Sequence, residues 1–169
     1  ATVRGAGVAI DTVEAGGTLA VDAGTDALTL GTVTGSGITL SGGRAALGTV
    51  AASDALKLAI AEDLSFGELS GGSIEASAGA VDGDTLRSTG TATVRGAGVA
   101  IDTVEAGGTL VVDAGADALT LGTVTGSGVT LSGGRATLGT VAASDALKLT
   151  IAEDLSFGEL SGGSIEASA

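Results

Sequence analysis

A four-residue phrase returns through the whole chain at intervals of 17 to 20 residues. It reads LGTV at 30–33 and at 47–50, and it returns in altered form as FGEL at 66–69. We use the last residue of each phrase as an anchor, and the anchors are Val13, Val33, Val50, Leu69, Leu86, Val104, Val124, Val141 and Leu160. Successive anchors lie 20, 17, 19, 17 and 18 residues apart, and the series then starts again. A step of this length limits the chain to folds in which short units stack on one another.

Within each step, the residues read as short strands separated by corners. LTL at 28–30, ITL at 38–40 and LKL at 56–58 alternate apolar and polar residues, as half-buried strands do. Gly or Asp stands two residues before each anchor, which predicts a corner with unusual backbone angles. The step is too short for a strand–helix–strand unit, and the helix and Asn of leucine-rich repeats are missing. The sequence therefore predicts an all-β fold, a parallel β-helix (β-solenoid) of about nine coils of 17–20 residues.

A longer repeat is superimposed on the short one. Residues 1–78 reappear as 92–169 with five differences, all exchanges among small or β-branched residues that a strand accepts. The intervening segment GAVDGDTLRSTGT at 79–91 looks like a linker, but it supplies the anchor Leu86. We therefore expect 79–91 to be a coil, and 1–169 to be one continuous solenoid segment. Its tandem unit is 91 residues and five coils long, with units at 1–91 and 92–169, the second incomplete. We expect this segment to be a window from a longer rod.

The apolar side chains suit a thin core. The chain has 31 Gly, two Phe and no Trp, Tyr, Met, Pro or Cys, so Ala, Val, Leu and Ile must form the interior. Phe66 shares its column, three residues before the anchor, with Gly83 in the next coil. One interpretation is that the ring leans over the space at Gly83, since interiors are densely packed. The other is that Gly83 is an ordinary corner and Phe66 an ordinary core residue.

Charge and composition exclude several partners and activities. The net charge is −13 and the seven Lys and Arg are scattered, so we expect no nucleic-acid partner. No apolar run approaches the ~20 residues of a membrane span, so we expect no membrane insertion. The chain has no His or Cys, and Lys57 and Lys148 lack any surrounding motif, so we expect no catalytic residues and no enzyme. No phosphate-binding loop or other cofactor motif occurs, and we expect no cofactor.

Three surface patterns remain as candidates. Asp82, Asp84 and Asp102 fall at one corner of adjacent coils and form a weak calcium candidate, against the interpretation of a solvated corner. Arg87 and Glu105 each follow an anchor and should face each other. A Thr column precedes the anchors and suits either an ice-binding ladder or ordinary strand edges. Its members are Thr12, Thr32, Thr49, Thr85, Thr103, Thr123 and Thr140, interrupted by Glu68 and Glu159.

Repeats such as GGTLAVDAGTDALTLGTVTGSGITLSGG at 16–43 resemble the repeat regions of filamentous haemagglutinin-like adhesins, exoproteins of bacterial two-partner secretion. The resemblance covers the whole chain and is one of period and composition. It implies a right-handed β-helix shaft, export through an outer-membrane partner, and a place outside the cell or at the bacterial surface. The family's N-terminal secretion domain does not occur in these residues, and its repeats are usually rich in Asn, of which this chain has none. No binding residue can be transferred.

The function expected from these observations is structural. The chain would be a shaft segment of a large secreted or surface-displayed adhesin, which holds a distal binding region away from the cell without catalysis. A host receptor or surface glycan would bind other parts of such a protein. One alternative is a β-helical passenger of an exported toxin or polysaccharide-active enzyme, whose active part lies outside this segment. A further alternative is an ice- or calcium-binding solenoid.

Overall fold

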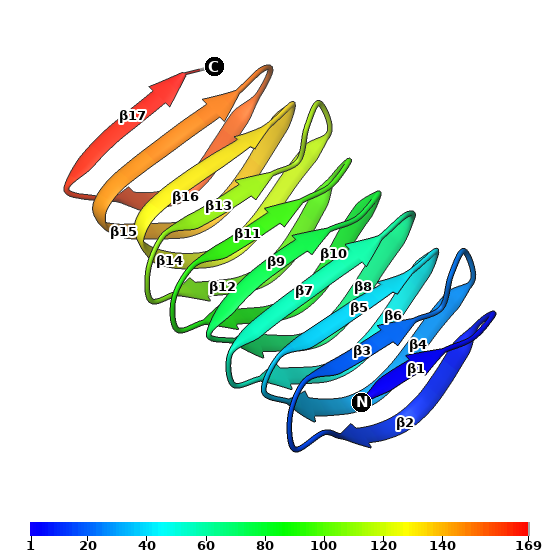
Figure 1. Cartoon of the computed structure of the whole chain (residues 1–169). Helices are drawn as coiled ribbons and strands as arrows, with labels where there is room; N and C mark the ends of the chain where they lie inside the picture. The colour runs from blue at the N-terminus through cyan, green and yellow to red at the C-terminus, as the bar shows by residue number, and fades with distance from the viewer. Residues whose placement is uncertain (169) are drawn as a thin grey trace.

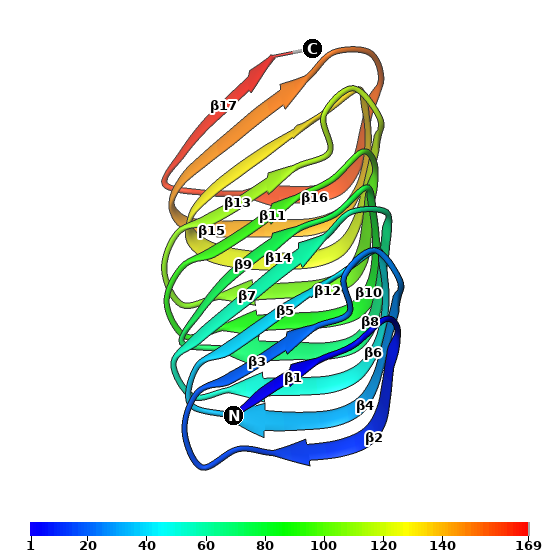
Figure 2. The ribbon, with the colours of Figure 1, turned by 45° about the vertical axis from the view of Figure 1, so that its right-hand side comes forward.

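The computed structural model describes residues 1–168 and confirms the predicted all-β parallel β-helix. Seventeen strands form one sheet, and every strand pairs in parallel with strands of the neighbouring coils. The chain winds as a stack of coils, with its two ends at opposite ends of the stack (Figures 1 and 2). Backbone hydrogen bonds therefore run along the length of the solenoid, from each coil to the next.

The strands fall into two series that alternate along the chain. The first six even-numbered strands, β2 to β12, pair in one series; odd-numbered strands β1 to β13 pair in the other, and β14 and β15 run through both. The strands are β1 Thr2–Arg4, β2 Val8–Glu14, β3 Leu19–Asp22, β4 Ala27–Gly35, β5 Ile38–Gly42, β6 Arg44–Ala52, β7 Ala55–Ile60, β8 Asp63–Gly71, β9 Ser73–Ser77, β10 Ala80–Ser88, β11 Ala92–Arg95, β12 Val99–Ala106, β13 Leu110–Asp113, β14 Ala118–Gly133, β15 Arg135–Ile151, β16 Leu155–Ser161 and β17 Ser164–Ser168.

The nine anchors form one continuous ladder. Each anchor is the register partner of the next, from Val13 opposite Val33 to Val141 opposite Leu160. The seven inner anchors are buried, while Val13 and Leu160, in the two end coils, are half-buried. Strand β10, within 79–91, pairs with β8 on one side and β12 on the other. That segment is therefore a coil of the solenoid.

The corner two residues before each anchor has a different cause from the one predicted. Gly31 and Gly48 lie at such corners, and positive φ angles occur only at Gly7, Gly24, Gly98 and Gly115 within residues 1–168. The ladder pairs Leu30 with Leu47 and Thr32 with Thr49 but skips the two corner glycines. A Cβ on Gly48 would lie 2.5 Å from the carbonyl oxygen of Gly31 in the preceding coil. Glycine is needed here because two backbones approach closely, not because the backbone is left-handed.

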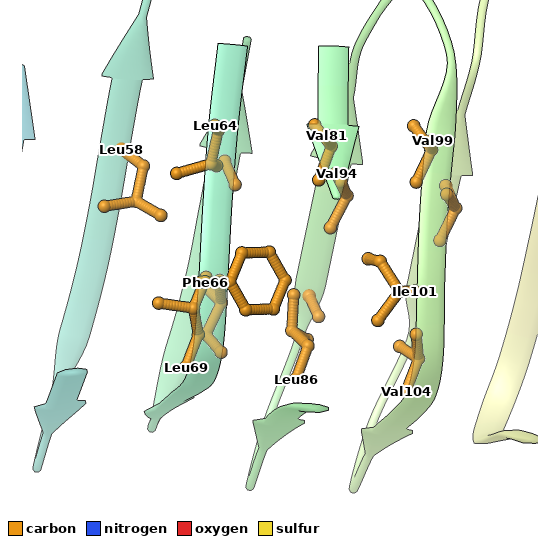
Figure 3. Packing of buried hydrophobic residues seen from close by; sticks show 14 of the residues in the cluster. Leu58, Leu64, Phe66, Leu69, Val81, Leu86, Val94, Val99, Ile101 and Val104 are labelled. Atoms are coloured by element: carbon orange, nitrogen blue, oxygen red, sulfur yellow. The ribbon is translucent and has the colours of Figure 1, made fainter. Parts of the chain in front are cut away.

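The core is a set of apolar columns inside the coils. In β8, Leu64, Phe66 and Leu69 point inward, and the residues between them are less buried. Gly83 is the register partner of Phe66, and a Cβ on Gly83 would lie 2.6 Å from Cε1 of the ring and closer still to Cζ and Cε2. The ring lies between β8 and β10 in Figure 3. Of the two interpretations, the structure therefore supports the one in which Phe66 fills the space at Gly83.

Candidate functional surfaces

Because the chain winds into stacked coils, equivalent outward-facing residues of successive coils form columns that run along the solenoid. Successive side chains of a strand point to opposite faces, and the parallel register places equivalent residues of neighbouring coils about 4.8 Å apart. Any chemistry at the surface is therefore repeated along the stack. The candidate surfaces are such columns, and the corners between them.

The predicted Thr column is continuous in the structure. Its members pair in register from Thr12 to Glu159, with Glu68 between Thr49 and Thr85. Thr85 and Thr103 are half-buried, and the other five Thr are exposed. Three neighbouring Thr before Glu68 and four after it thus lie in line along the solenoid. Glu68 and Glu159 interrupt the column with a longer, charged side chain.

Every basic side chain lies opposite or beside an acid in the next coil. Arg4 pairs in register with Asp22, and Arg95 with Asp113. The other five form ion pairs: Arg44–Glu62 at 2.6 Å, Lys57–Glu75 at 3.7 Å, Arg87–Glu105 at 3.0 Å, Arg135–Glu153 at 2.9 Å and Lys148–Glu166 at 3.9 Å. The hydrogen bond from Arg44 to Glu62, with the charges of Glu62 and Asp63, raises the pKa of the Arg44 guanidinium. These exposed pairs favour the correct register only weakly, because solvent screens them.

Arg87 joins three coils. Its Nε donates to Glu105 Oε2 of the following coil at 3.0 Å, which confirms the predicted pair. Its Nη1 also lies 3.5 Å from Glu68 Oε1 of the preceding coil. This second contact is not evident from the sequence, because Glu68 precedes its anchor and Arg87 follows its own.

Each unit contains one hydrogen-bond network at a corner. The sequence did not predict this network. The hydroxyl of Ser41 and the backbone N–H of Gly24 both donate to Asp22 Oδ1, each at 3.0 Å. Asp113 accepts the equivalent bonds from Ser132 and Gly115. The Gly24 N–H, followed by the Ser41 hydroxyl, lowers the pKa of Asp22. The network fixes a turn with glycine at positive φ, and its sequence signal was VDAG followed one coil later by SGG.

The structure does not group the three residues of the candidate calcium site. Asp82 and Asp84 are exposed on either side of the buried Gly83, and the register partner of Asp82 in the next coil is Ala100, not an acid. Asp102 is exposed on β12. Within residues 1–168, no three acidic side chains are grouped so that they could hold a metal ion. The sequence placed these residues at one corner, but the structure does not bring their carboxylates to one point.

A shallow groove of about 390 Å³ lies outside the core near Phe66. Its polar side chains are Thr29, Ser65, Asp82 and Asp84, and its floor includes Gly83. The carboxylates give it a negative rim. No His or Cys occurs in the chain, so the only ionisable side chains in the lining are the two carboxylates.

Comparison of the chain with protein-family models, with curated proteins and with solved structures gives no match. Residues 1–168 contain no helix long and apolar enough to cross a membrane. The functional interpretation therefore rests on the geometry of the solenoid and on its surface columns.

Proposed function

We propose that the chain is a structural shaft segment of a large bacterial adhesin, secreted or displayed at the cell surface, and that it holds a distal binding region away from the cell. The observation that supports this most is the unbroken ladder of nine anchors, which crosses from the first unit into the second through β10 and β12. A spacer must be rigid along its whole length. The two units meet as an ordinary pair of stacked coils, so their junction introduces no hinge.

The length of such a shaft follows from the number of its coils. At about 4.8 Å per coil, nine coils make about 43 Å, and each further unit of five coils adds about 24 Å. A gene can therefore lengthen the shaft by duplicating one unit, as the near-identity of 1–78 and 92–169 suggests. Because each coil is bonded only to its neighbours, added units leave the existing ones unchanged.

The composition supports export as an extended chain. Neither Cys nor Pro occurs, and the side chains are small, so no disulfide or proline isomer has to form before or after passage through a pore. We infer an outer-membrane secretion partner, folding outside that membrane, and a final location in the medium or at the bacterial surface. The chain itself performs no catalysis in this proposal. A receptor or glycan would be bound by the distal region.

The test is a change of shaft length in the full adhesin on cells. Removal of 91 consecutive residues, one unit, should keep the coil register and bring the distal region about 24 Å closer to the cell. The distance is measured by fluorescence localisation of a distal tag, or by electron microscopy of the purified protein. Receptor binding by the purified adhesin should be unchanged, while attachment of cells should fall. Loss of binding in the purified protein, or an unchanged distance, would refute the spacer role.

Ice binding is a second candidate, and the in-register Thr column is the observation that favours it. Regularly spaced hydroxyls can order water, but Glu68 and Glu159 break the column, and the coils vary between 17 and 20 residues. Thermal hysteresis of the purified chain tests this directly. If it occurs, Thr123→Leu and Thr140→Leu should reduce it, whereas Thr39→Leu on the opposite series of strands should not.

A further inference from the structure

One long face of the solenoid has no net charge, although the whole chain carries −13. The face consists of the outward side chains of β1, β3, β5, β7, β9, β11 and β13, continued by residues 128–132, 146–150 and β17, and these strands lie side by side (Figures 1 and 2). Its charged residues, four basic and four acidic, are Arg4, Asp22, Lys57, Glu75, Arg95, Asp113, Lys148 and Glu166. The other three basic and sixteen acidic residues lie outside it. We call this surface the neutral face, and it is the side on which two copies of the chain repel each other least.

The uncharged residues of the neutral face are all small. Between the charged positions, the outward residues of its strands are Gly, Ala, Ser, Thr or Val. Packed sheets lie about 10 Å apart, and small side chains on both sides allow this approach along the whole length. Sterically, the neutral faces of two copies can therefore lie against each other.

The charges of the neutral face follow one order along the solenoid. Each basic residue has an acidic register partner in the next coil, and the four pairs are Arg4–Asp22, Lys57–Glu75, Arg95–Asp113 and Lys148–Glu166. A second copy that lies face to face and runs in the same direction without a shift places each charge in the middle column opposite its own kind. An antiparallel copy reverses the order, so that bases can lie opposite acids.

One antiparallel register brings the lysines and glutamates of two copies together. The middle column of the neutral face runs in register through Lys57, Glu75, Thr93, Val111, Thr130, Lys148 and Glu166. Val111 is thus three coils from Lys57 and three from Glu166, and it is equally far from Glu75 and Lys148. If Val111 faces its own copy, Lys57 lies opposite Glu166. Glu75 then lies opposite Lys148, and the two-fold symmetry makes four ion pairs between the copies.

The two lysines retain donors for these contacts. Lys57 Nζ lies 3.7 Å from Glu75 Oε2, and Lys148 Nζ lies 3.9 Å from Glu166 Oε2. The hydrogen bonds between Arg and Glu on other parts of the surface are shorter, at 2.6–3.0 Å. All four side chains of the lysine pairs are more than half exposed. Because an ammonium group has three donors, each lysine can bind one carboxylate of its own chain and one of the second copy.

The same register contains one contact between like charges, at Asp113. This carboxylate faces its own copy, but it already accepts hydrogen bonds from the Ser132 hydroxyl and the Gly115 N–H. Arg95 lies one coil away in each copy. An arginine on this solenoid can reach across one coil diagonally, as the 3.5 Å contact of Arg87 with Glu68 shows. Two arginines and two aspartates therefore form a cluster without net charge.

The size of this contact indicates a weak interface. Seven coils overlap, which is about 34 Å at about 4.8 Å per coil, and strands of five residues are about 16 Å long. Each copy then contributes about 500 Å², and a total of about 1,000 Å² is the lower limit for a specific interface. Lys57 and Lys148 are separated by one unit of 91 residues, so additional units add the same contacts in the same register.

We propose that the neutral face is a docking surface for a second copy of this chain, antiparallel to the first, with Val111 at the two-fold axis. Lys57, Glu75, Lys148 and Glu166 select this partner and its orientation. The acidic remainder of the surface keeps two copies from associating through other faces. Shafts on one cell point the same way, so antiparallel pairing joins shafts of different cells. Only this last consequence rests on the proposed function.

The experiment is sedimentation velocity of the full chain and two double variants, from about 10 µM to about 1 mM, where a small interface is populated. One variant combines Lys57→Glu with Lys148→Glu, and the other combines Glu75→Lys with Glu166→Lys. Each variant alone should associate at least tenfold more weakly than the unchanged chain, because its middle column has charges of one sign. Their equimolar mixture should associate at least as strongly as the unchanged chain. Circular dichroism verifies that both variants fold.

A pair of spin labels tests the orientation, since the chain has no Cys of its own. Thr109→Cys labels the coil of Val111, and Thr18→Cys labels the equivalent position of the first unit. Electron–electron distances in the dimer should be about 20 Å or less at residue 109 and about 50 Å at residue 18, ten coils apart. Short distances at both positions would overturn the antiparallel orientation.

The other outcomes are equally decisive. A chain that stays monomeric to about 1 mM would overturn the docking surface. Stronger association of the Glu75→Lys/Glu166→Lys variant, which is less negative overall, would show that net charge and not pairing governs contact. A mixture that fails to restore association would also overturn the pairing. Because the purified chain is used, these results do not depend on the spacer role, which the deletion of one unit tests separately.

Discussion

Phe66 and Gly83 are register partners in neighbouring coils, and the ring of the first fills the volume that the second leaves empty. A solenoid built from near-identical coils risks pairing any coil with any other, because the backbone pattern is the same throughout. Phe66 also pairs with Leu47 in the preceding coil, but its ring occupies the space at Gly83 in the following one. A ring placed in this way distinguishes one pairing from the rest. This pair therefore fixes the order of the coils as well as filling the core.

The pair predicts strongly coupled substitutions. Gly83→Val should lower the free energy of unfolding by about 1–3 kcal/mol or more, because the new side chain meets the ring. In the background of Phe66→Leu, the same substitution should be nearly neutral, and urea unfolding of the four proteins measures the coupling. Gly17→Val, at a position where a Cβ meets nothing within 4 Å, serves as the control for the same change without the ring. Additive effects at residues 66 and 83 would show that the ring does not depend on the glycine.

The corner glycines predict a contrast between two kinds of glycine. Gly48→Ala should be destabilising by about 1–3 kcal/mol, since its Cβ would meet the carbonyl of Gly31 in the preceding coil. Gly17→Ala should change stability by no more than about 0.5 kcal/mol, because a Cβ there meets nothing within 4 Å. Thermal and urea unfolding measure both. Similar losses at the two positions would indicate that loss of backbone freedom, and not close approach, sets the need for glycine.

The Asp22 network predicts a pH-dependent contribution to stability. The pKa of Asp22 is lowered from 3.8 in the folded state, chiefly by the Gly24 N–H and then by the Ser41 hydroxyl. The contribution is therefore fully present above the ordinary pKa and is lost as the pH falls through the lower, folded-state pKa. Asp22→Asn should be less stable than the unchanged chain at pH 7, and the difference should vanish in the acid range below 3.8.

The control for this prediction is Asp145→Asn, which removes one negative charge from another corner. It should not reproduce the pH profile, since Asp145 takes no part in such a network in the structure. Unfolding free energies of the three proteins at intervals from pH 7 to pH 2 provide the comparison. A difference between Asp22→Asn and the unchanged chain that persists to the lowest pH would contradict the charged carboxylate as its origin.

The ion pair that joins three coils predicts a small, salt-dependent effect. Arg87→Gln should lower the free energy of unfolding by about 1 kcal/mol or less, because Arg87 and its partners are about half exposed. The loss should shrink in 1 M salt, where charges are screened within about 3 Å. Lys148→Gln, which removes one longer contact of 3.9 Å, should have a smaller effect. A loss at Arg87 that is large and independent of salt would point to packing of its alkyl chain instead.

The periodic part of this fold was predictable from the sequence. The anchors, the Thr column and the Arg87–Glu105 pair were all found by aligning steps of 17–20 residues, and the register of the structure matches that alignment. This works because a parallel solenoid converts sequence spacing directly into spatial stacking. Even a size mismatch within a column, as between Phe66 and Gly83, could be interpreted once the column was known.

Alignment of the coils does not predict contacts between side chains of different columns. It also does not predict the backbone geometry at the corners. The contact of Arg87 with Glu68 is diagonal. Asp22 and Ser41 share a column, but the turn at Gly24 whose N–H also binds the Asp22 carboxylate depends on the local backbone geometry. Glycine at a corner suits either a left-handed backbone or a close approach, and residue type alone does not distinguish them. The calcium candidate is not assembled either, since the register places Ala100, and not Asp102, opposite Asp82.

The measurement that tests the central claim most directly is small-angle scattering of the chain beside a version lengthened by one complete 91-residue unit. If the chain is a continuous solenoid whose length is set by its coils, the lengthened version should be about 24 Å longer. The cross-sectional radius of gyration should be the same in both. A lengthened protein with an unchanged maximum dimension and a larger cross-section, or with a bend between units, would contradict the single continuous rod.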